Sequence, residues 1–454
     1  MKNIILITID CLRYDYSEQL VNKIKKTLGN GIVFKNAYST GPATAFSFTG
    51  MLCSKFTIMP DETTNIKFSD GKQIIEYLPN RDCIRKSLVS ELKKHDYETY
   101  ALHNNPYIPY VTSDQDIDHC LDSEQKILAQ LLFKKLPVLY KYIHAIWFKI
   151  KFLINKFSNY KLTTGLPYLN SEEITKRVKE TLKKRTAKPI YLHLHYMDAH
   201  GPFSFRKTKQ HNATITKEDT ITANQIFIKI NNGCKKIEES DIGILKKIYE
   251  NELSQITREI INVIRHLESI GALEDYLLII TSDHGQLFGE NGLYDHAYPI
   301  NDKKDLTKML CKELLHVPLA IFGLGNKDVE KVVSLVDISP TILDIVGITK
   351  PAIWYGKTII TNMEEPAISE VRGLGCNVYA IREGSNTLIY NDGTKEEKLK
   401  TIDTKNHKKI HNRLVKKLKM HLDKKKKLFL LSLRYKIKKM EKTLDTTAFK
   451  KSNV

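Results

Sequence analysis

Residues 3–10, NIILITID, predict a β-strand that is buried on both faces and ends in a carboxylate. Four of these residues are isoleucines, and a nearly unbroken β-branched run is typical of a strand inside a parallel sheet. Asp10 would then stand at the carboxyl end of the strand, where open α/β sheets place their ligands. Because a buried carboxylate is costly without a partner, we expect a metal ion or another cation beside Asp10.

A second stretch, residues 276–285 (YLLIITSDHG), has the same pattern of an apolar run followed by polar ligands. Two such strands in one parallel sheet would bring Asp10, Asp283 and His284 to the same edge. Carboxylate and imidazole groups in this combination are suited to holding one divalent ion. The chain therefore predicts a metal site built from two strand ends that lie far apart in the sequence.

A third core strand is predicted at residues 189–197, PIYLHLHYM. Its His193 and His195 alternate with apolar residues, and we expect them to be buried and hydrogen-bonded within the core rather than to act as ligands. Asp198 and His200 follow the end of the strand, so we place them at the same sheet edge as Asp10.

Residues 39–50, STGPATAFSFTG, predict a loop that enters the N-terminus of a helix. Helix N-termini bind anions, and a hydroxyl at such a place can act as a nucleophile if a metal ion lowers its pKa. The chemistry alone leaves four candidates, and the alternative is that these residues only cap the helix or form turns. The candidates are Thr40, Thr44, Ser47 and Thr49.

The bulk composition indicates a folded protein of more than one structural unit, with 454 residues and 42% hydrophobic residues. Its seven cysteines form no CxxC pair, which favours a reducing compartment. The core strand begins at once, so we expect no signal peptide, and no run reaches the roughly 18 apolar residues of a spanning helix. We therefore expect a cytoplasmic protein, with peripheral attachment at the inner membrane face as an alternative.

Positive charge is concentrated in two segments of a chain whose net charge is +19. Residues 405–454 contain 18 Lys or Arg and 3 Asp or Glu, and residues 126–161 contain eight Lys and no acid, interleaved with aromatic residues. Pro137 should divide 126–161 into two helices. Both segments are compatible with an anionic membrane surface, while the alternatives are a helical lid and a solvated helix. Nucleic-acid binding is unlikely because no recognition fold is evident.

The order of predicted elements divides the chain into three parts. Residues 1–360 would form a catalytic α/β domain with a mostly parallel sheet flanked by helices and a helical insertion at about 122–165. Residues 361–404 would form a small C-terminal subdomain with antiparallel strands at 379–382 and 387–390, and 405–454 a basic helical tail. Within the first part, we expect residues 204–240 to form an irregular loop over the site.

Six segments occur in an order that resembles the sulfatase family within the alkaline phosphatase superfamily. The resemblance runs from Asn3 to about residue 400 and implies a doubly wound α/β core with a smaller C-terminal α+β subdomain. The segments are NIILITIDCLRYD (3–15), GPATAFSF (41–48), HYMDAHGPF (195–203), TSDHGQLFGENGLYDH (281–296), HVPLAIFG (316–323) and VDISPTILDIVGI (336–348).

The resemblance implies roles for individual residues. Asp10, Asp283 and His284 match metal ligands, and Thr44 falls at the position of the family's nucleophile, where its oxygen would also bind the metal. His200 matches a histidine that contacts the substrate oxyanion or protonates the leaving group.

Further positions are implied less directly. His296 lies where relatives carry a residue that binds the transferred group, and Arg13 is expected to bind substrate. Asp198, His200 and His296 could alternatively hold a second ion, as in two-metal relatives.

The chain also departs from the sulfatase pattern at four positions. Thr44 stands in place of the Cys or Ser that is oxidised to formylglycine, and Phe46 and Phe48 replace the Pro and Arg of that motif. Cys11 replaces the second of two paired aspartates. A mixed site of this kind favours manganese or zinc, although calcium stays possible.

These departures resemble the phosphate-transferring relatives of the sulfatases. We therefore expect a metal-dependent hydrolase or transferase that acts on phosphate or sulfate esters, with a lipid or a glycan as the substrate, through a Thr44 nucleophile. Two alternatives stay open: a sulfuric ester hydrolase, and a non-catalytic scaffold or binding protein at a membrane surface.

Overall fold

A computed structural model describes the chain in two compact units. Unit 1 comprises Met1–Asn36, Val89–Ala297 and Cys311–Glu330, and unit 2 comprises Ala37–Leu88, Tyr298–Leu310 and Lys331–Val454. The residues that the structure describes are 1–57, 66–69, 72–75, 86–102, 104–105, 108, 116–120, 169–183, 185–203, 215–231, 237–296, 305–361, 364–373 and 375–451.

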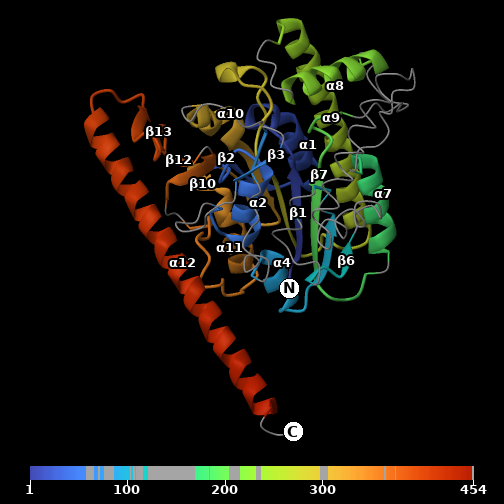
Figure 1. Ribbon diagram of the computed structural model, residues 1–454. Coiled ribbons are helices and arrows are strands. Elements are labelled where there is room, and N and C mark those ends of the chain that lie inside the picture. Colours follow the sequence, from blue (N-terminus) through green and yellow to red (C-terminus); the bar gives the residue numbers. More distant parts are fainter. Residues whose placement is uncertain are drawn as a thin grey trace. The chain divides into compact units, whose positions relative to one another are not determined.

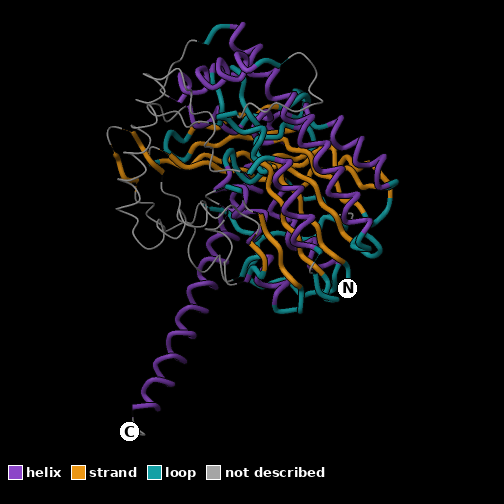
Figure 2. The backbone as a smooth tube through the Cα atoms, turned by 90° about the vertical axis from the view of Figure 1, so that its right-hand side faces the viewer, coloured by secondary structure: helices purple, strands orange, loops and turns teal. Residues whose placement is uncertain are grey.

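An eight-stranded sheet, whose strands lie wholly or mainly in unit 1, confirms the predicted α/β fold (Figures 1 and 2). The strand order is β10-β2-β9-β8-β1-β7-β5-β6. The strands are β1 (Asn3–Ile9), β2 (Gly31–Tyr38), β5 (Glu98–Leu102), β6 (His119–Cys120), β7 (Ile190–Tyr196), β8 (Tyr276–Ser282), β9 (His316–Phe322) and β10 (Asn326–Ser334).

Strand β1 lies at the centre of this sheet, as its sequence predicts. It pairs in parallel with β7 on one side and with β8 on the other. Successive residues Ile4, Ile5, Leu6 and Ile7 are all fully buried, because both faces of the sheet are covered by helices. The pairing of β8 with β9 is antiparallel, so the sheet is mostly rather than wholly parallel.

The helices of unit 1 pack their apolar sides on the sheet and on one another. Helix α9 contacts α1, α7 and α8, and a capping box of Asn170 and Glu173 starts α7. The bounds are α1 (Glu18–Leu28), α4 (Leu88–Lys93), α7 (Ser171–Leu182), α8 (Lys217–Asn231), α9 (Glu239–Ser269) and α10 (Lys312–Leu315), and short 3-10 segments occupy Tyr14–Tyr16 and Glu290–Gly292.

The expectation of an irregular loop throughout residues 204–240 was wrong, because α8 lies within it. Ala223, Ile226 and Ile230 recur at helical spacing and are buried in the core of unit 1. Thr216 accepts from the main-chain N–H of Asp219, and Asp219 accepts from that of Thr216, which starts the helix. Phe227 and Ile228 are apolar but not buried, and they obscure this spacing in the sequence.

Unit 2 contains the predicted antiparallel C-terminal sheet, in the order β11-β12-β13-β14. The strands predicted at 379–382 and 387–390 are confirmed as parts of β12 and β13. The elements are α2 (Thr44–Cys53), β3 (Ile66–Ser69), β4 (Lys72–Ile75), α11 (Ile338–Ile345), β11 (Ala367–Gly373), β12 (Cys376–Glu383), β13 (Asn386–Asn391), β14 (Glu396–Lys400) and α12 (His407–Lys451), with 3-10 segments at Asp305–Leu310 and Leu335–Asp337.

Helix α12 packs on the C-terminal sheet through Ile410, Leu414 and Leu418. A buried ion pair adds to this contact, because Lys425 Nζ of α12 lies 2.5 Å from Glu370 Oε2 of β11. Figure 1 shows α12 as a single long helix. The basic tail predicted at 405–454 is thus helical and contributes to the core of unit 2.

Strand β11 also holds the loop that precedes α2. The Glu370 N–H donates to the Thr40 carbonyl at 2.8 Å, and the Ser369 hydroxyl donates to the Ser39 carbonyl at 2.6 Å. A Cβ at Gly41 would lie 2.7 Å from the Glu370 carbonyl oxygen, so only glycine allows this approach.

Several predictions concern parts of the chain that the structure does not test. The helical insertion at 122–165 and the basic segment 126–161 lie outside the described residues. The boundaries at 360 and 404 stay predictions. Among the described helices, none combines the length and the apolar character needed to cross a bilayer.

Candidate active site

The register of three strands brings their ends to one edge of the sheet. Ile9 pairs with Tyr196 of β7 and with Ser282 of β8, so Asp10 and Asp283 follow the ends of two neighbouring strands. The Asp10 N–H also donates to the Tyr196 carbonyl at 2.9 Å, which extends the ladder by one step. Both carboxylates are fully buried at this edge.

Three side-chain atoms converge there. His284 Nε2 lies 3.6 Å from Asp10 Oδ1 and 3.5 Å from Asp283 Oδ2, which is too long for a hydrogen bond. Two ligand atoms that share a tetrahedral ion at about 2.1 Å lie about 3.4 Å apart. The spacing of His284 from each carboxylate therefore fits a shared divalent ion, and the clusters around Asp10 able to hold an ion, among the described residues, are Asp10 with Cys11 and His284, and Asp10 with His195 and Asp283.

The orientation and charge of His284 suit a metal ligand. Its Nδ1 lies 2.9 Å from the Gly285 carbonyl, which fixes Nδ1 as the protonated nitrogen and leaves Nε2 as an electron-pair donor. Burial, and then repulsion by His296, lower the pKa of His284, so the imidazole is neutral. Gly285 cannot be replaced without a shift, because a Cβ there would collide with the Glu313 carbonyl oxygen.

Three residues that the sequence did not assign to the site contact Asp10. Asn105 Nδ2 donates to Asp10 Oδ2 at 3.1 Å, His195 Nε2 lies 3.3 Å from the same oxygen, and the Cys11 thiol donates to Oδ1 at 3.1 Å. Burial alone would raise the pKa of Asp10, but the charge of His200 and the His195 hydrogen bond hold that pKa well below its usual range. Asp10 is therefore ionised, as a metal ligand must be.

Weak sequence signals exist for each of these neighbours. Asn105 lies shortly after the end of β5, and Cys11 adjoins Asp10. His195 was expected to be buried and hydrogen-bonded, and it is buried, with a 2.9 Å contact between its Nδ1 and the Thr8 hydroxyl. Its Nε2 faces Asp10. The alternation of histidine and apolar residues along the strand does not predict this contact.

His200 and His296 lie together beside Cys11. The two imidazole rings are 5.0 Å apart, and the nitrogen and sulfur atoms of the three side chains are close enough to share an ion. His296 Nδ1 lies 2.9 Å from Asp295 Oδ1. Burial opposes a charge on His296, but the Asp295 carboxylate outweighs it and raises the pKa of His296 to about 9. A positive charge at His296 can neutralise an anionic substrate.

Asp198 has contacts different from those expected of a metal ligand. Its Oδ1 accepts from the main-chain N–H of Ser171 at 3.0 Å and from the Ser171 hydroxyl at 3.1 Å, so it stabilises the start of α7. Within the described residues, the groups that could hold a metal ion include His200 and His296 but not Asp198. The second-ion role of Asp198 stays a prediction.

Arg13 is buried between two carboxylates. Its Nη2 lies 2.7 Å from Asp15 Oδ2 and its Nη1 2.6 Å from Glu290 Oε1, and its guanidinium lies over the rings of Tyr16 and Phe288. A substrate anion would have to compete with both carboxylates for this cation, so the predicted substrate-binding role is not favoured by its contacts.

Thr44 is the first residue of α2 and is buried in unit 2. The other three hydroxyls of its segment have main-chain partners. Thr40 donates to the Phe46 carbonyl, Ser47 to that of Gly41, and Thr49 to that of Ala45, at 2.9, 3.1 and 2.8 Å. These bonds account for Thr40, Ser47 and Thr49 in structural terms.

Known proteins share sequence and fold with this chain. A family model described as Sulfatase matches residues 2–348. The chain is 35% identical over 106 residues to the low-salt glycan biosynthesis sulfotransferase Agl7 of Haloferax volcanii, covering 23% of this chain and 25% of that protein. It is 34% identical over 179 residues to bovine (Bos taurus) arylsulfatase K, and this match covers 35% of this chain and 31% of that protein. The matches thus span about a quarter to a third of these relatives.

Solved structures share the fold over most of the chain. A phosphonate monoester hydrolase from Silicibacter pomeroyi superposes with a TM-score of 0.60 at 17% identity, covering 93% of this chain and 95% of that one. The structure of BT4656 with its substrate D-glucosamine-2-N,6-O-disulfate superposes with a TM-score of 0.61 at 15% identity, and the match covers 94% of this chain and 98% of that one. At such identities the likeness concerns the fold.

Proposed function

The chain belongs to the sulfatase family, and from that premise we propose that it is a metal-dependent enzyme that hydrolyses or transfers a sulfate, phosphate or phosphonate ester group through Thr44. One observation carries the proposal: Asp10, Asp283 and His284 are fully buried at one edge of the sheet, and His284 Nε2 lies within 3.6 Å of a carboxylate oxygen of each aspartate. Core packing alone gives no reason for two carboxylates at such a place.

These three residues would hold the metal ion, and their mixture of oxygen and nitrogen atoms suits manganese or zinc better than calcium. A divalent ion, when bound, would lower the pKa of an attacking hydroxyl and offset negative charge on the ester. The Cys11 thiol beside Asp10 is a further soft donor, which also favours zinc over calcium.

The remaining residues have distinct tasks in the proposed reaction. The Thr44 hydroxyl gives its proton to solvent, and its oxygen forms a bond to sulfur or phosphorus while the bond from that atom to the leaving oxygen breaks. His200 keeps Nδ1 against the Gly201 carbonyl and presents Nε2, which gives a proton to the leaving oxygen. Charged His296 neutralises a non-bridging oxygen. Attack by water or an acceptor alcohol then releases the group and restores the Thr44 hydroxyl.

The substrate class is proposed from the relatives. Agl7 is a sulfotransferase of glycan biosynthesis, and arylsulfatase K is named for sulfate esters, so a sulfated glycan is one candidate. The Thr44 position and the shared fold with a phosphonate monoester hydrolase favour a phosphorus ester as the other. A lipid-linked ester would agree with the basic segments but has less support.

The deciding experiment measures turnover of matched aryl sulfate, phosphate monoester, phosphodiester and phosphonate substrates with added manganese, zinc or calcium. Thr44→Ala should lose activity at least about a hundredfold, because removal of a nucleophile leaves only binding and electrostatics. Thr44→Ser, which keeps a hydroxyl, should retain part of the activity. Thr49→Ala is the matched control, because its hydroxyl binds a carbonyl of its own helix.

Two outcomes would overturn parts of this proposal. Metal-dependent turnover that survives in Thr44→Ala would remove Thr44 as the nucleophile. Metal binding without turnover of any of the four esters would favour a non-catalytic scaffold. Selective cleavage of the aryl sulfate would assign the chain to sulfate esters.

A further inference from the structure

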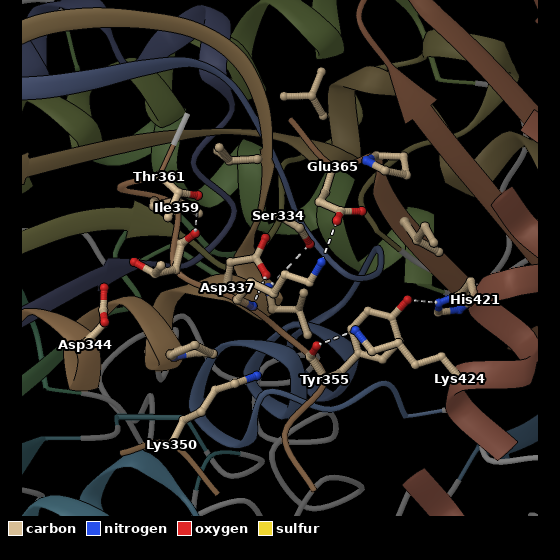
Figure 3. A pocket seen from close by; sticks show the side chains of 18 of the residues that line it. Ser334, Asp337, Asp344, Lys350, Tyr355, Ile359, Thr361, Glu365, His421 and Lys424 are labelled. Carbon is tan, nitrogen blue, oxygen red and sulfur yellow. Dashed lines mark hydrogen bonds and ion pairs between the residues drawn. The ribbon is translucent and has the colours of Figure 1, made fainter. Parts of the chain in front are cut away.

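Unit 2 contains a pocket of about 890 Å³ that shares no residue with the candidate active site (Figure 3). Its walls come from the end of β10, from α11, from the segment 347–361 and from α12. Figure 3 shows Lys350 and Lys424 extending toward the middle of the pocket from opposite sides.

Two of the pocket's ammonium groups contact main-chain carbonyls rather than carboxylates. Lys350 Nζ donates to the Gly356 carbonyl at 2.5 Å, and Lys424 Nζ donates to that of Tyr355 at 2.8 Å. Neither forms an ion pair with a carboxylate among the described residues. Each of these two ammonium groups is therefore partly buried and has no carboxylate as a direct partner.

Two of the pocket's carboxylates contact Lys357, one through the ammonium group and one through the main chain. Glu365 Oε1 pairs with Lys357 Nζ at 2.5 Å, and Asp337 Oδ1 accepts from the Lys357 main-chain N–H at 2.9 Å. Burial lowers the pKa of Lys424, and repulsion by Lys357 and Lys350 lowers it further. The pocket thus concentrates positive charge that an anion would relieve.

His421 of α12 is a buried polar group that faces the pocket. It is 2% exposed, and its Nδ1 lies 2.8 Å from the Tyr355 hydroxyl. Its Nε2 has no hydrogen-bond partner among the described residues. Burial and the charges of Lys425 and Lys424 hold the pKa of His421 well below its usual value, so the ring is neutral. A buried nitrogen of this kind is costly unless a ligand contacts it.

Apolar side chains complete the wall. Phe56, Ile348 and Ile368 are buried and line the pocket, and Phe56 meets the His421 ring edge-on at a centroid distance of 4.7 Å. A free inorganic ion would leave these surfaces in contact with water. A ligand with an apolar body would cover them.

We propose that this pocket binds a small organic oxyanion, a sulfated or phosphorylated molecule with an apolar or ring-shaped body. The oxyanion lies between Lys350 and Lys424, and the body lies against Phe56 and Ile368. His421 Nε2 hydrogen-bonds to a polar atom of the ligand. The inference goes beyond the proposed catalytic function and does not depend on it.

Lysine footprinting of the full-length protein tests the location. Acylation of lysines is followed by mass spectrometry with phenyl sulfate, phenyl phosphate, inorganic sulfate or inorganic phosphate present. The expected result is protection of Lys350 and Lys424 by phenyl sulfate, by phenyl phosphate or by both, with no protection of Lys426. Lys426 is the internal control because it is an exposed residue of the same helix.

Calorimetric titration with the same four compounds tests the chemistry. Lys350→Gln and Lys424→Gln should each weaken binding of the phenyl compounds at least about tenfold, or about 1.4 kcal/mol, whereas Lys426→Gln should leave it unchanged. Phenyl sulfate and phenyl phosphate distinguish the two oxyanions, and either one supports the proposal.

Three results would overturn the proposal. They are binding without protection of Lys350 and Lys424, equal affinity in all three variants, and equal affinity for the inorganic and phenyl anions. None of these readouts uses turnover, so a failure here leaves the proposed ester chemistry untouched, and a failure of that chemistry leaves this site untouched.

Discussion

At the scale of single residues, the active site concentrates charge where the rest of the core excludes it. Asp10 and Asp283 are fully buried next to strands of isoleucine and leucine. Such carboxylates survive in a core only when a cation or several hydrogen bonds compensate for lost water. The contacts of Asp10 with Asn105 and His195 supply part of this compensation and leave the side facing His284 for an ion.

Replacing a ligand should therefore remove the metal before it disturbs the fold. We expect Asp10→Asn and His284→Gln to lower the affinity for zinc or manganese at least about tenfold, since even outer-shell changes cost about that much. Elemental analysis after equilibrium dialysis measures the effect. Glu98→Gln is the control, because Glu98 is a buried carboxylate at the start of β5 that binds His119. Equal metal content in all three variants would contradict the assignment.

At the scale of elements, α12 is part of the core of unit 2. Lys425 and Glu370 are both buried, and their ion pair fixes α12 to β11. Removing one partner of a buried pair is costly, whereas removing both is much less so.

Lys425→Met should accordingly lower the free energy of unfolding by about 3–5 kcal/mol, because it leaves the Glu370 carboxylate without its ammonium group. Urea denaturation measures the change. Lys425→Met combined with Glu370→Gln should recover a substantial part of the loss, and the exposed Lys426→Met should cost almost nothing. A destabilisation shared by Lys426→Met would show that the helix, not the ion pair, is responsible.

The pocket between α11 and α12 should respond to pH through Asp337. Burial raises the pKa of Asp337 to about 6. The positive charge of Lys424 lowers this pKa, and the negative charge of Glu365 raises it. Asp337 is negative above that pH and repels an anion, so phenyl sulfate should bind more tightly as the pH falls through 6. Sulfate esters keep one charge in this range, and His421 stays neutral because its pKa lies well below its usual value.

Calorimetry between pH 5 and pH 7.5 checks this expectation. Asp337→Asn should bind phenyl sulfate with the low-pH affinity at every pH. A pH dependence that persists in Asp337→Asn would assign the titration to another group.

The strands that carry the active-site residues could be predicted from the sequence, but helix α8 and the contact of Asn105 with Asp10 could not. Strands β1, β7 and β8 have long apolar runs, and parallel strands share an edge, so the meeting of Asp10 with Asp283 followed from sequence. Helix α8 was missed because its buried residues are few and the apolar Phe227 and Ile228 lie between two of them. The contact of Asn105 with Asp10 depends on how a side chain turns after a strand, which no periodicity reports.

The pocket in unit 2 could not be predicted for a different reason. Lys350 and Lys424 are 74 positions apart, and each by itself is an ordinary lysine in a lysine-rich chain. Only the packing of α12 beside the segment 347–361 brings their charges together. The role of Thr44 likewise stays a prediction that rests on resemblance and on its place at the start of α2.

At the scale of the whole molecule, charge is distributed unevenly. Residues 405–454 carry a net charge of +15 out of the +19 of the chain. On the described part of α12, Lys416, Lys419, Lys426 and Lys427 are exposed. Each lysine near an anionic bilayer contributes about 1 kcal/mol of attraction.

We therefore expect the protein to sediment with phosphatidylserine-containing liposomes and not with neutral ones. Raised salt should release it, because screening shortens the range of exposed charges to about 10 Å at 0.1 M. Lys→Gln at positions 416, 419, 426 and 427 together should reduce the bound fraction at least about tenfold. Equal sedimentation of this variant would leave residues 126–161 as the remaining candidate for the contact.

The two hydrogen bonds from β11 to the loop before α2 determine when this loop can become ordered during synthesis. Residues 39–41 are made before Ser369, Glu370 and Lys425. At about 5–20 residues per second, roughly 20–80 s separate Thr44 from Lys425. During that interval the loop lacks its main-chain partners and α2 lacks its final support. A nascent chain in which β11 has not yet been made should therefore lack activity, and a protein truncated before Ala367 would keep every active-site residue named above and lose both hydrogen bonds that secure the loop.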